Sequence, residues 1–291
     1  MRQRDDIKRA TKAMSAGPDS DVSQAFWEER GKADMSTGPE VTMFGEHERY
    51  LAYVHERELS YLQRWIAPNA STRVLDIGCG TGRLAVDLAN QAGDVLGVDI
   101  AESLLFRARA TASARGLENV SFRQWTSDQP LEGGPFDAVL ISGVLNCVTP
   151  EIAGDIVHAA AGVLKPGGLL YLRNRCANAE AFTREVGPRQ PPVVYRTGPE
   201  YVRLVEAVPA LTILEERYLF PPVCVPKILY YDVIPQQVRD LAPVRAGLDL
   251  WFRAESVTAE SRVAWMTPLH TRLVHRLGIS ASFRVMVARR G

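Results

Sequence analysis

The hydrophobic and polar positions of this chain predict short buried strands that alternate with amphipathic helices. Five mostly apolar runs have the length of strands: 73–77, 94–98, 120–124, 136–142 and 169–173. Between most of them, apolar residues recur every three or four positions, which is the spacing of helices that cover a sheet. Strands and helices that alternate in this way form parallel sheets with right-handed crossovers. We therefore predict a doubly wound, mostly parallel α/β fold.

The pattern is less regular after the fifth strand, but it adds the remaining elements. Segment 197–207 predicts a helix, and 211–220 and 283–288 predict two more strands, which makes the sheet seven-stranded. Ahead of the first strand, apolar residues at helical spacing across 45–66 predict an amphipathic helix that Pro68 ends.

These elements divide the chain into five parts. They are a flexible tail (1–21), an N-terminal helical lid (22–70), a cofactor-binding α/β domain (71–220), an insertion (221–280) and the last strand of the α/β domain (281–291). The insertion lies between the last two strands and carries several aromatic residues. We expect it to form a helical lid over a substrate pocket.

A glycine-rich loop follows the first strand and precedes a helix. Residues 76–82 have the sequence Asp-Ile-Gly-Cys-Gly-Thr-Gly. Glycines let the backbone approach a ligand closely, and the start of a helix offers unpaired N–H groups, so the loop predicts a site for a nucleotide-like cofactor. The dinucleotide pattern G-x-G-x-x-G/A is not matched, because Arg83 occupies its sixth position and would disturb close packing there.

The stretch from Val74 to Arg173 resembles the class I S-adenosylmethionine-dependent methyltransferases. The segment VLDIGCGTG is similar to their D/E-x-G-x-G-x-G loop. The segments FDAVLIS and LKPGG, the latter followed by LLYLRN, resemble the later strands of the same family. The resemblance implies a Rossmann-like methyltransferase that uses S-adenosyl-L-methionine as its cofactor.

The resemblance also implies a set of cofactor-binding residues. They are Asp76, Gly78, Cys79, Gly80, Gly82, Asp99, Ile100, Trp125, Thr126 and Ser142. Asp99 lies at a strand end, 17 residues after Gly82, where an acidic side chain would accept hydrogen bonds from both ribose hydroxyls. Trp125 and Thr126 depart from the family, whose members often carry an acidic pair at that place.

The catalytic residues are not identified by any motif. Methyl transfer from a sulfonium depends mainly on how the acceptor is positioned, and a base helps only when the acceptor must lose a proton. His47 and His55, on or beside the helix that precedes the first strand, are candidates for this base. Asn146 is a third candidate because it follows the fourth strand, at the end of the sheet where ligands bind.

Composition limits the partners that we expect. Thirty-four Lys and Arg balance thirty-four Asp and Glu, which argues against nucleic acid as a partner. The four cysteines are far apart and form no zinc pattern, so we expect reduced thiols and no metal. We find no signal peptide and no apolar run long enough to span a membrane, and we expect a cytoplasmic protein.

These patterns favour a small-molecule O- or N-methyltransferase, with a role in biosynthesis and a partly apolar substrate. The alternative is a protein that keeps the methyltransferase fold and binds the cofactor without transferring methyl groups. An NAD-dependent oxidoreductase is disfavoured by Arg83. The sequence does not identify the acceptor atom, and it leaves a homo-oligomer open.

Overall fold

A computed structural model of the chain describes residues 20–32, 48–177, 180–184, 193–219, 243 and 281–291. Its sheet contains the seven strands that the sequence predicts. They are β1 (Arg73–Ile77), β2 (Asp94–Asp99), β3 (Val120–Gln124), β4 (Phe136–Ser142), β5 (Leu164–Ala177), β8 (Leu211–Tyr218) and β9 (Ala281–Arg290). From one edge the strands run β3, β2, β1, β4, β5, β9, β8. All pair in parallel except β9, which is antiparallel to both β5 and β8, so the predicted fold class is confirmed.

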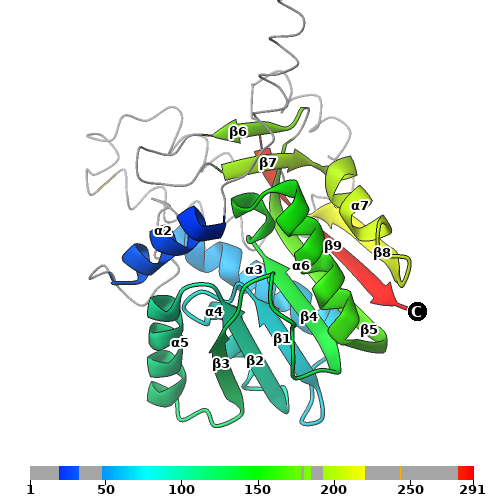
Figure 1. The fold of residues 1–291 in the computed structure, drawn as a ribbon. Helices are drawn as coiled ribbons and strands as arrows, with labels where there is room; N and C mark the ends of the chain where they lie inside the picture. The colour runs from blue at the N-terminus through cyan, green and yellow to red at the C-terminus, as the bar shows by residue number, and fades with distance from the viewer. Residues whose placement is uncertain (1–19, 33–47, 178–179, 185–192, 220–242, 244–280) are drawn as a thin grey trace, which may run out of the picture.

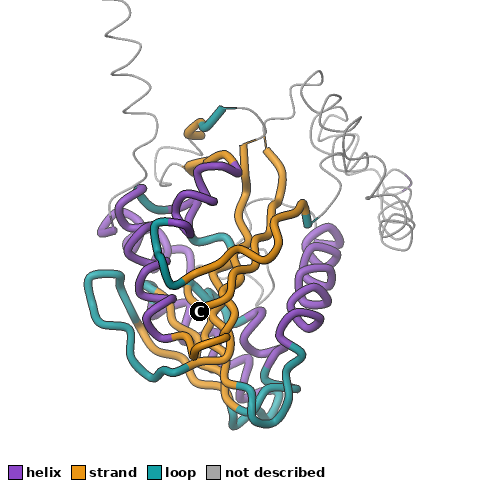
Figure 2. The backbone as a smooth tube through the Cα atoms, turned by 90° about the vertical axis from the view of Figure 1, so that its right-hand side faces the viewer, coloured by secondary structure: helices purple, strands orange, loops and turns teal. Residues whose placement is uncertain are grey.

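Helices cover both faces of this sheet (Figures 1 and 2). One face carries α3 (Glu48–Ile66), α4 (Arg83–Leu88) and α5 (Glu102–Ala114). The other face carries α6 (Pro150–Val163) and α7 (Gly198–Glu206). Each face has its own apolar core, because successive strand residues point to opposite sides of the sheet. None of the helices among the described residues is long and apolar enough to cross a membrane.

Local sequence explains where several helices begin. Thr149 caps α6 by accepting a hydrogen bond from the backbone N–H of Ile152, and Pro150 occupies the first turn, where its missing N–H costs nothing. The helix α7 starts with a capping box between Thr197 and Glu200.

The fifth strand is longer than predicted at both ends. Leu164 already pairs with Phe136, and a register shift between Phe136 and Ala138 accommodates the LKPGG turn within the strand. At its other end β5 extends beyond the end of β4, as far as Ala177. The extra length holds a short strand that the sequence did not predict, β7 (Val193–Thr197), which pairs with β5 at Cys176 and Ala177.

Three further elements lie near the carboxyl ends of the strands. The strand β6 (Phe182–Arg184) pairs with β7, and the rings of Phe182 and Tyr195 stack 4.5 Å apart. The 3-10 helix η2 (Leu145–Cys147) follows β4, and α2 (Ser20–Lys32) packs on α5 (Figure 1). Residues 1–19 of the predicted tail and, apart from Pro243, the predicted insertion lie outside the described residues.

Candidate cofactor and active site

Three neighbouring strands each place a polar side chain at the same edge of the sheet. Asp76 near the end of β1, Ser142 at the end of β4 and Arg173 on β5 all lie on the face that α3 covers, and Ser142 pairs directly with Arg173. Ligands of open α/β sheets bind outside the carboxyl ends of the strands. This edge is therefore the candidate site.

The glycine loop between β1 and α4 has a backbone that other residues would strain. Gly78, Gly80 and Gly82 have φ angles of 70°, 56° and 79°, in the left-handed region. A Cβ on Gly78 would lie 2.2 Å from Val144 Cγ2, and one on Gly82 would lie 3.0 Å from both Ala108 and Phe122. A residue with a side chain would therefore be strained at each of these positions, which favours glycine.

Asp99 is buried at the end of β2 and already holds part of this loop. Its carboxylate accepts a hydrogen bond from the N–H of Gly80 at 2.8 Å and another from the N–H of Ala101 at 3.0 Å. Burial raises the pKa of Asp99 above its ordinary value, although these backbone donors act in the opposite direction. Each carboxylate oxygen has a second lone pair, so Asp99 can still accept hydrogen bonds from a diol.

Asp76 is the least compensated carboxylate of the site. It is 2% exposed, and burial raises its pKa to about 7. The guanidinium of Arg83 favours the charged form, but the nearby carboxylates of Glu58 and Asp99 oppose it. A backbone hydrogen bond from Ala85 also favours the charged form, but among the described residues these partners do not offset burial. A ligand with a positive charge would supply further compensation.

Glu58 of α3 lies at the same level but has all the partners it needs. Its carboxylate is fully buried and accepts hydrogen bonds from Arg173 at 3.0 and 3.2 Å, from Arg83 at 2.8 Å and from the Ser142 hydroxyl at 2.5 Å. These partners outweigh burial and lower the pKa of Glu58 to about 2. Glu58 is not among the site residues predicted from the sequence. It lies between Val54 and Leu62 at helical spacing, so a carboxylate on the buried face of the helix was the available signal.

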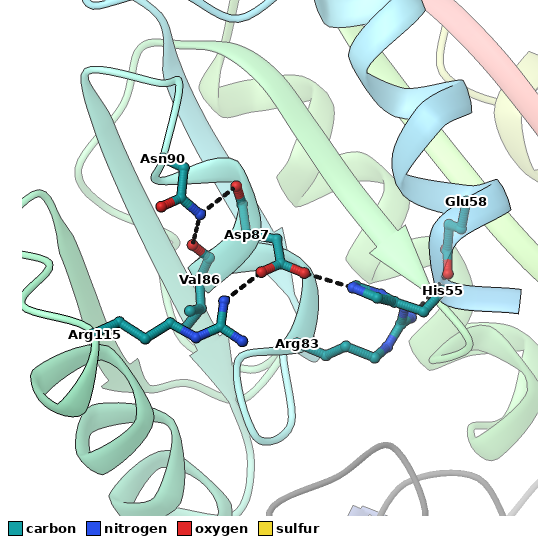
Figure 3. Close-up of polar contacts among 7 residues, drawn as sticks. All are labelled: His55, Glu58, Arg83, Val86, Asp87, Asn90 and Arg115. Atoms are coloured by element: carbon teal, nitrogen blue, oxygen red, sulfur yellow. Dashed lines mark hydrogen bonds and ion pairs between the residues drawn. The ribbon is translucent and has the colours of Figure 1, made fainter. Parts of the chain in front are cut away.

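Arg83 continues this network to the surface (Figure 3). Its guanidinium contacts His55 Nδ1 at 2.5 Å, and His55 Nε2 contacts Asp87, which also pairs with Arg115. Arg83 therefore points toward α3 and does not disturb the packing of the glycine loop. Both ring nitrogens of His55, a candidate base, are engaged in this arrangement, and His47 lies outside the described residues.

Asn146, the third candidate, is buried and makes hydrogen bonds with both ends of its amide. Its Nδ2 contacts the carbonyls of Arg175 and Val194 at 2.8 and 2.9 Å and the Tyr201 hydroxyl at 3.1 Å. Its Oδ1 accepts from the N–H of Arg175 at 3.0 Å. The side chain thus fastens η2 to β5 and β7.

The remaining predicted cofactor residues lie around the end of β2. Trp125 is buried in the core under α6, and its indole N–H donates to the Gln129 carbonyl at 3.1 Å. Ile100 and Trp27 of α2 both pack against the Ala101–Leu104 cluster, and Thr126 is half-buried. The Cys79 thiol is buried among core residues, which raises its pKa. Their contacts with a cofactor stay predictions.

Comparisons with known proteins agree with this geometry. Residues 74–168 match the family model described as "Methyltransferase domain". The chain is 34% identical over 141 residues to a ubiquinone biosynthesis O-methyltransferase of Caulobacter vibrioides, an alignment that covers 46% of this chain and 55% of the relative. It is 32% identical over 139 residues to a 23S rRNA (uracil(1939)-C(5))-methyltransferase of Marinomonas posidonica, covering 46% and 29%. The chain thus spans about half or less of these relatives.

A solved structure extends the likeness to nearly the whole fold. Geranyl diphosphate C-methyltransferase from Streptomyces coelicolor, crystallised with Mg²⁺, geranyl diphosphate and S-adenosyl-L-homocysteine, superposes with a TM-score of 0.58 at 17% identity. The superposition covers 95% of this chain and 99% of that one. The chain thus has the fold of this methyltransferase, and residues 74–168 within that fold match a methyltransferase domain.

Proposed function

We propose that this protein transfers the methyl group of S-adenosyl-L-methionine to a small molecule. One observation carries the proposal: two buried carboxylates with raised pKa values, Asp76 and Asp99, flank a loop whose left-handed backbone favours glycine. The similarity to a ubiquinone biosynthesis O-methyltransferase supports it, and geranyl diphosphate C-methyltransferase has the same fold.

The residues present fit the chemical groups of this cofactor. Asp99 has the free lone pairs to accept both ribose hydroxyls, and the glycine loop allows a close approach of the backbone. Asp76 would pair with the ammonium of the methionine part, which supplies the positive charge that the buried carboxylate lacks. When bound, the cofactor supplies a methyl group on a positively charged sulfur that is already an activated leaving group.

The chain's own contribution to the transfer is positional. The Glu58–Arg173 pair and the Asn146 anchor hold the ends of β4 and β5 and the loop after β4 in fixed positions. An acceptor held in line with the methyl group gains most of its rate from this placement. His55 and Asn146 have their polar atoms engaged, so neither is arranged as a base in this structure.

The first test is calorimetric titration with S-adenosyl-L-homocysteine. We expect the wild-type protein to bind it and Asp99→Ala to bind about 100-fold more weakly, because charged hydrogen bonds to the ribose are lost. Asp155→Ala, which changes an exposed carboxylate on α6, is the matched control and should bind like wild type. Absence of wild-type binding, or preferential binding of NAD, would overturn the proposal.

The second test identifies the acceptor class. The protein is incubated with a labelled methyl donor and a cell extract, which is then separated into small molecules, RNA and protein. Label in the small-molecule fraction is expected. Label in RNA would replace the small-molecule acceptor by an RNA, as in the 23S rRNA methyltransferase relative. Tight cofactor binding without label in any fraction would favour a protein that keeps the fold but does not transfer methyl groups.

A further inference from the structure

The helix α5 begins without a capping residue of its own. It follows Ala101, whose side chain cannot accept a hydrogen bond, and the first N–H groups of a helix have no partner within it. The partner comes from α2 instead. The carboxylate of Glu28 accepts from the N–H of Glu102 at 2.6 Å and from the N–H of Ser103 at 3.1 Å. A residue more than 70 positions earlier therefore caps α5.

Two further contacts fix Glu28 in this position. The Ser103 hydroxyl donates to the backbone carbonyl of Glu28 at 2.9 Å. One turn later, Gly31 lies so close to Ser103 that a Cβ would approach its Oγ to 2.2 Å, which only glycine avoids. Helix α2 thus contacts the start of α5 through the side chain and the backbone of Glu28.

The same helix reaches across the candidate cofactor site. Near its beginning, the Ser23 hydroxyl donates to the carbonyl of Cys147 at 3.2 Å, in the loop after β4. Toward its end, Trp27 packs against Ala101 and Leu104, shortly after β2. Helix α2 therefore bridges the loops that follow β2 and β4 (Figure 1).

Glu28 is linked to the ribose-binding candidate through the backbone. Asp99 accepts the N–H of Ala101, and Glu28 accepts the next two, so two carboxylates share three consecutive donors of one helix start. Helix starts favour negative charge, which lets both carboxylates lie there. The charge of Glu28 also contributes to the raised pKa of Asp99. The backbone that orients Asp99 is thus the backbone that Glu28 holds.

We propose that Glu28 is a positioning residue for the adenosine half of the cofactor: by capping α5 from α2, it fixes the backbone of residues 99–103 that orients Asp99 and Ile100. This inference rests on the proposed function, because it concerns the same cofactor. It adds a residue from the N-terminal helix to the site.

The experiment compares two ligands across three variants. S-adenosyl-L-homocysteine carries both halves of the cofactor, and 5′-methylthioadenosine carries only the adenosine half. Glu28→Ala should weaken the binding of both by the same factor, about tenfold, the size of a lost carboxylate cap. Glu28→Gln keeps one acceptor and should fall between. Glu29→Ala is the matched control, since Glu29 is the next residue, its side chain is 77% exposed and it pairs with Lys32 at the surface.

A second readout checks the cap without any ligand. Amide hydrogen exchange of the peptide that contains Glu102 and Ser103 should accelerate in Glu28→Ala and stay unchanged in Glu29→Ala. A purely structural role would lower the melting temperature without changing either dissociation constant, and that result would overturn the inference.

The outcomes separate this inference from the proposed function. If wild-type protein binds neither ligand, the proposed function fails. If wild type binds both and Glu28→Ala binds them equally well, only the role of Glu28 is overturned. A loss confined to S-adenosyl-L-homocysteine would place the effect on the methionine half and would also overturn it.

Discussion

The carboxyl ends of the strands form two regions, and the pKa values of the buried carboxylates are shifted in opposite directions in them. At the ends of β1 and β2, burial raises the pKa values of Asp76 and Asp99. Beside the ends of β4 and β5, Glu58 of α3 is buried just as deeply, but Arg173 of β5 and Arg83 of α4 lower its pKa to about 2. Since the depth of burial is similar, the difference comes from the partners that the chain itself supplies.

This contrast separates a ligand site from its support. A buried carboxylate that already has its cations, like Glu58, stabilises the scaffold and has little left for a ligand. A buried carboxylate without enough of them, like Asp76, is costly to the empty protein and gains most from a cationic ligand. We therefore assign the β1–β2 half to cofactor binding and the Glu58 network to holding β4 and β5 in place.

The largest effect is expected when the supporting half loses its anion. Glu58→Ala should lower the free energy of unfolding by about 5 kcal/mol, because Arg173 and Arg83 would both lose their buried ion pair with this carboxylate. Urea denaturation measures this loss. Glu56→Ala, an exposed glutamate on the same helix, should change stability by less than about 0.5 kcal/mol. Equal stability of the two variants would contradict the scaffold role.

The same residue predicts a pH dependence. The pKa of Glu58 is lowered from 4.5 to about 2, so its stabilising contribution is complete above pH 4.5 and is lost as the pH falls toward 2. The difference corresponds to about 3 kcal/mol. In Glu58→Gln, unfolding free energy should depend less on pH across this window than in wild type. An unchanged slope would contradict the assignment.

Asp76 should behave in the opposite way. Its pKa is raised from 3.8 to about 7, so the empty wild-type protein loses stability as the pH rises through this range and carries the full cost above pH 7. Asp76→Asn removes the charge and should stabilise the empty protein at pH 8 by up to about 4 kcal/mol. It should also weaken binding of S-adenosyl-L-homocysteine. A variant that is both less stable and equally able to bind would remove the distinction between the two halves.

The sequence predicts the residues of the β1–β2 half but not the Glu58 network, and the reason is physical. The glycine loop and Asp99 belong to one strand–loop–helix–strand unit, so their spacing along the chain reflects their spacing in space. Arg173 meets Glu58 across 115 residues, and Ser103 meets Glu28 across 75. Such contacts leave no local pattern. The sequence offered one indication of the Glu58–Arg173 pair, namely a carboxylate on the apolar face of α3.

The seven main strands were predicted correctly for a related reason. Strands buried on both faces, such as β4, are almost wholly apolar and stand out in the sequence. The short strand β7 pairs with the part of β5 that extends beyond β4, and it is also held by a hydrogen bond from Asn146. Neither can be recognised before the strands are paired.

Asn146 tests whether the loop after β4 belongs to the support or to the chemistry. Asn146→Ala should cost about 3 kcal/mol of stability, since the carbonyls of Arg175 and Val194 and the N–H of Arg175 would lose buried partners. Thermal unfolding measures the loss, and Cys147→Ala at the adjacent position is the control. Cofactor affinity should change little. Normal stability combined with abolished methyl transfer would make Asn146 a catalytic residue instead.

The smallest effect is expected at His55, which joins the network at its outer end. Because its two ring nitrogens contact Arg83 and Asp87, His55→Gln should cost about 1 kcal/mol of stability while Asp87 keeps Arg115 and Arg83 keeps Glu58. Once an acceptor is found, the rate of methyl transfer in this variant should stay within a few-fold of wild type at every pH. A hundredfold loss of rate, with stability unchanged, would show that His55 leaves this network to act as the base, and the supporting half would then take part in the chemistry.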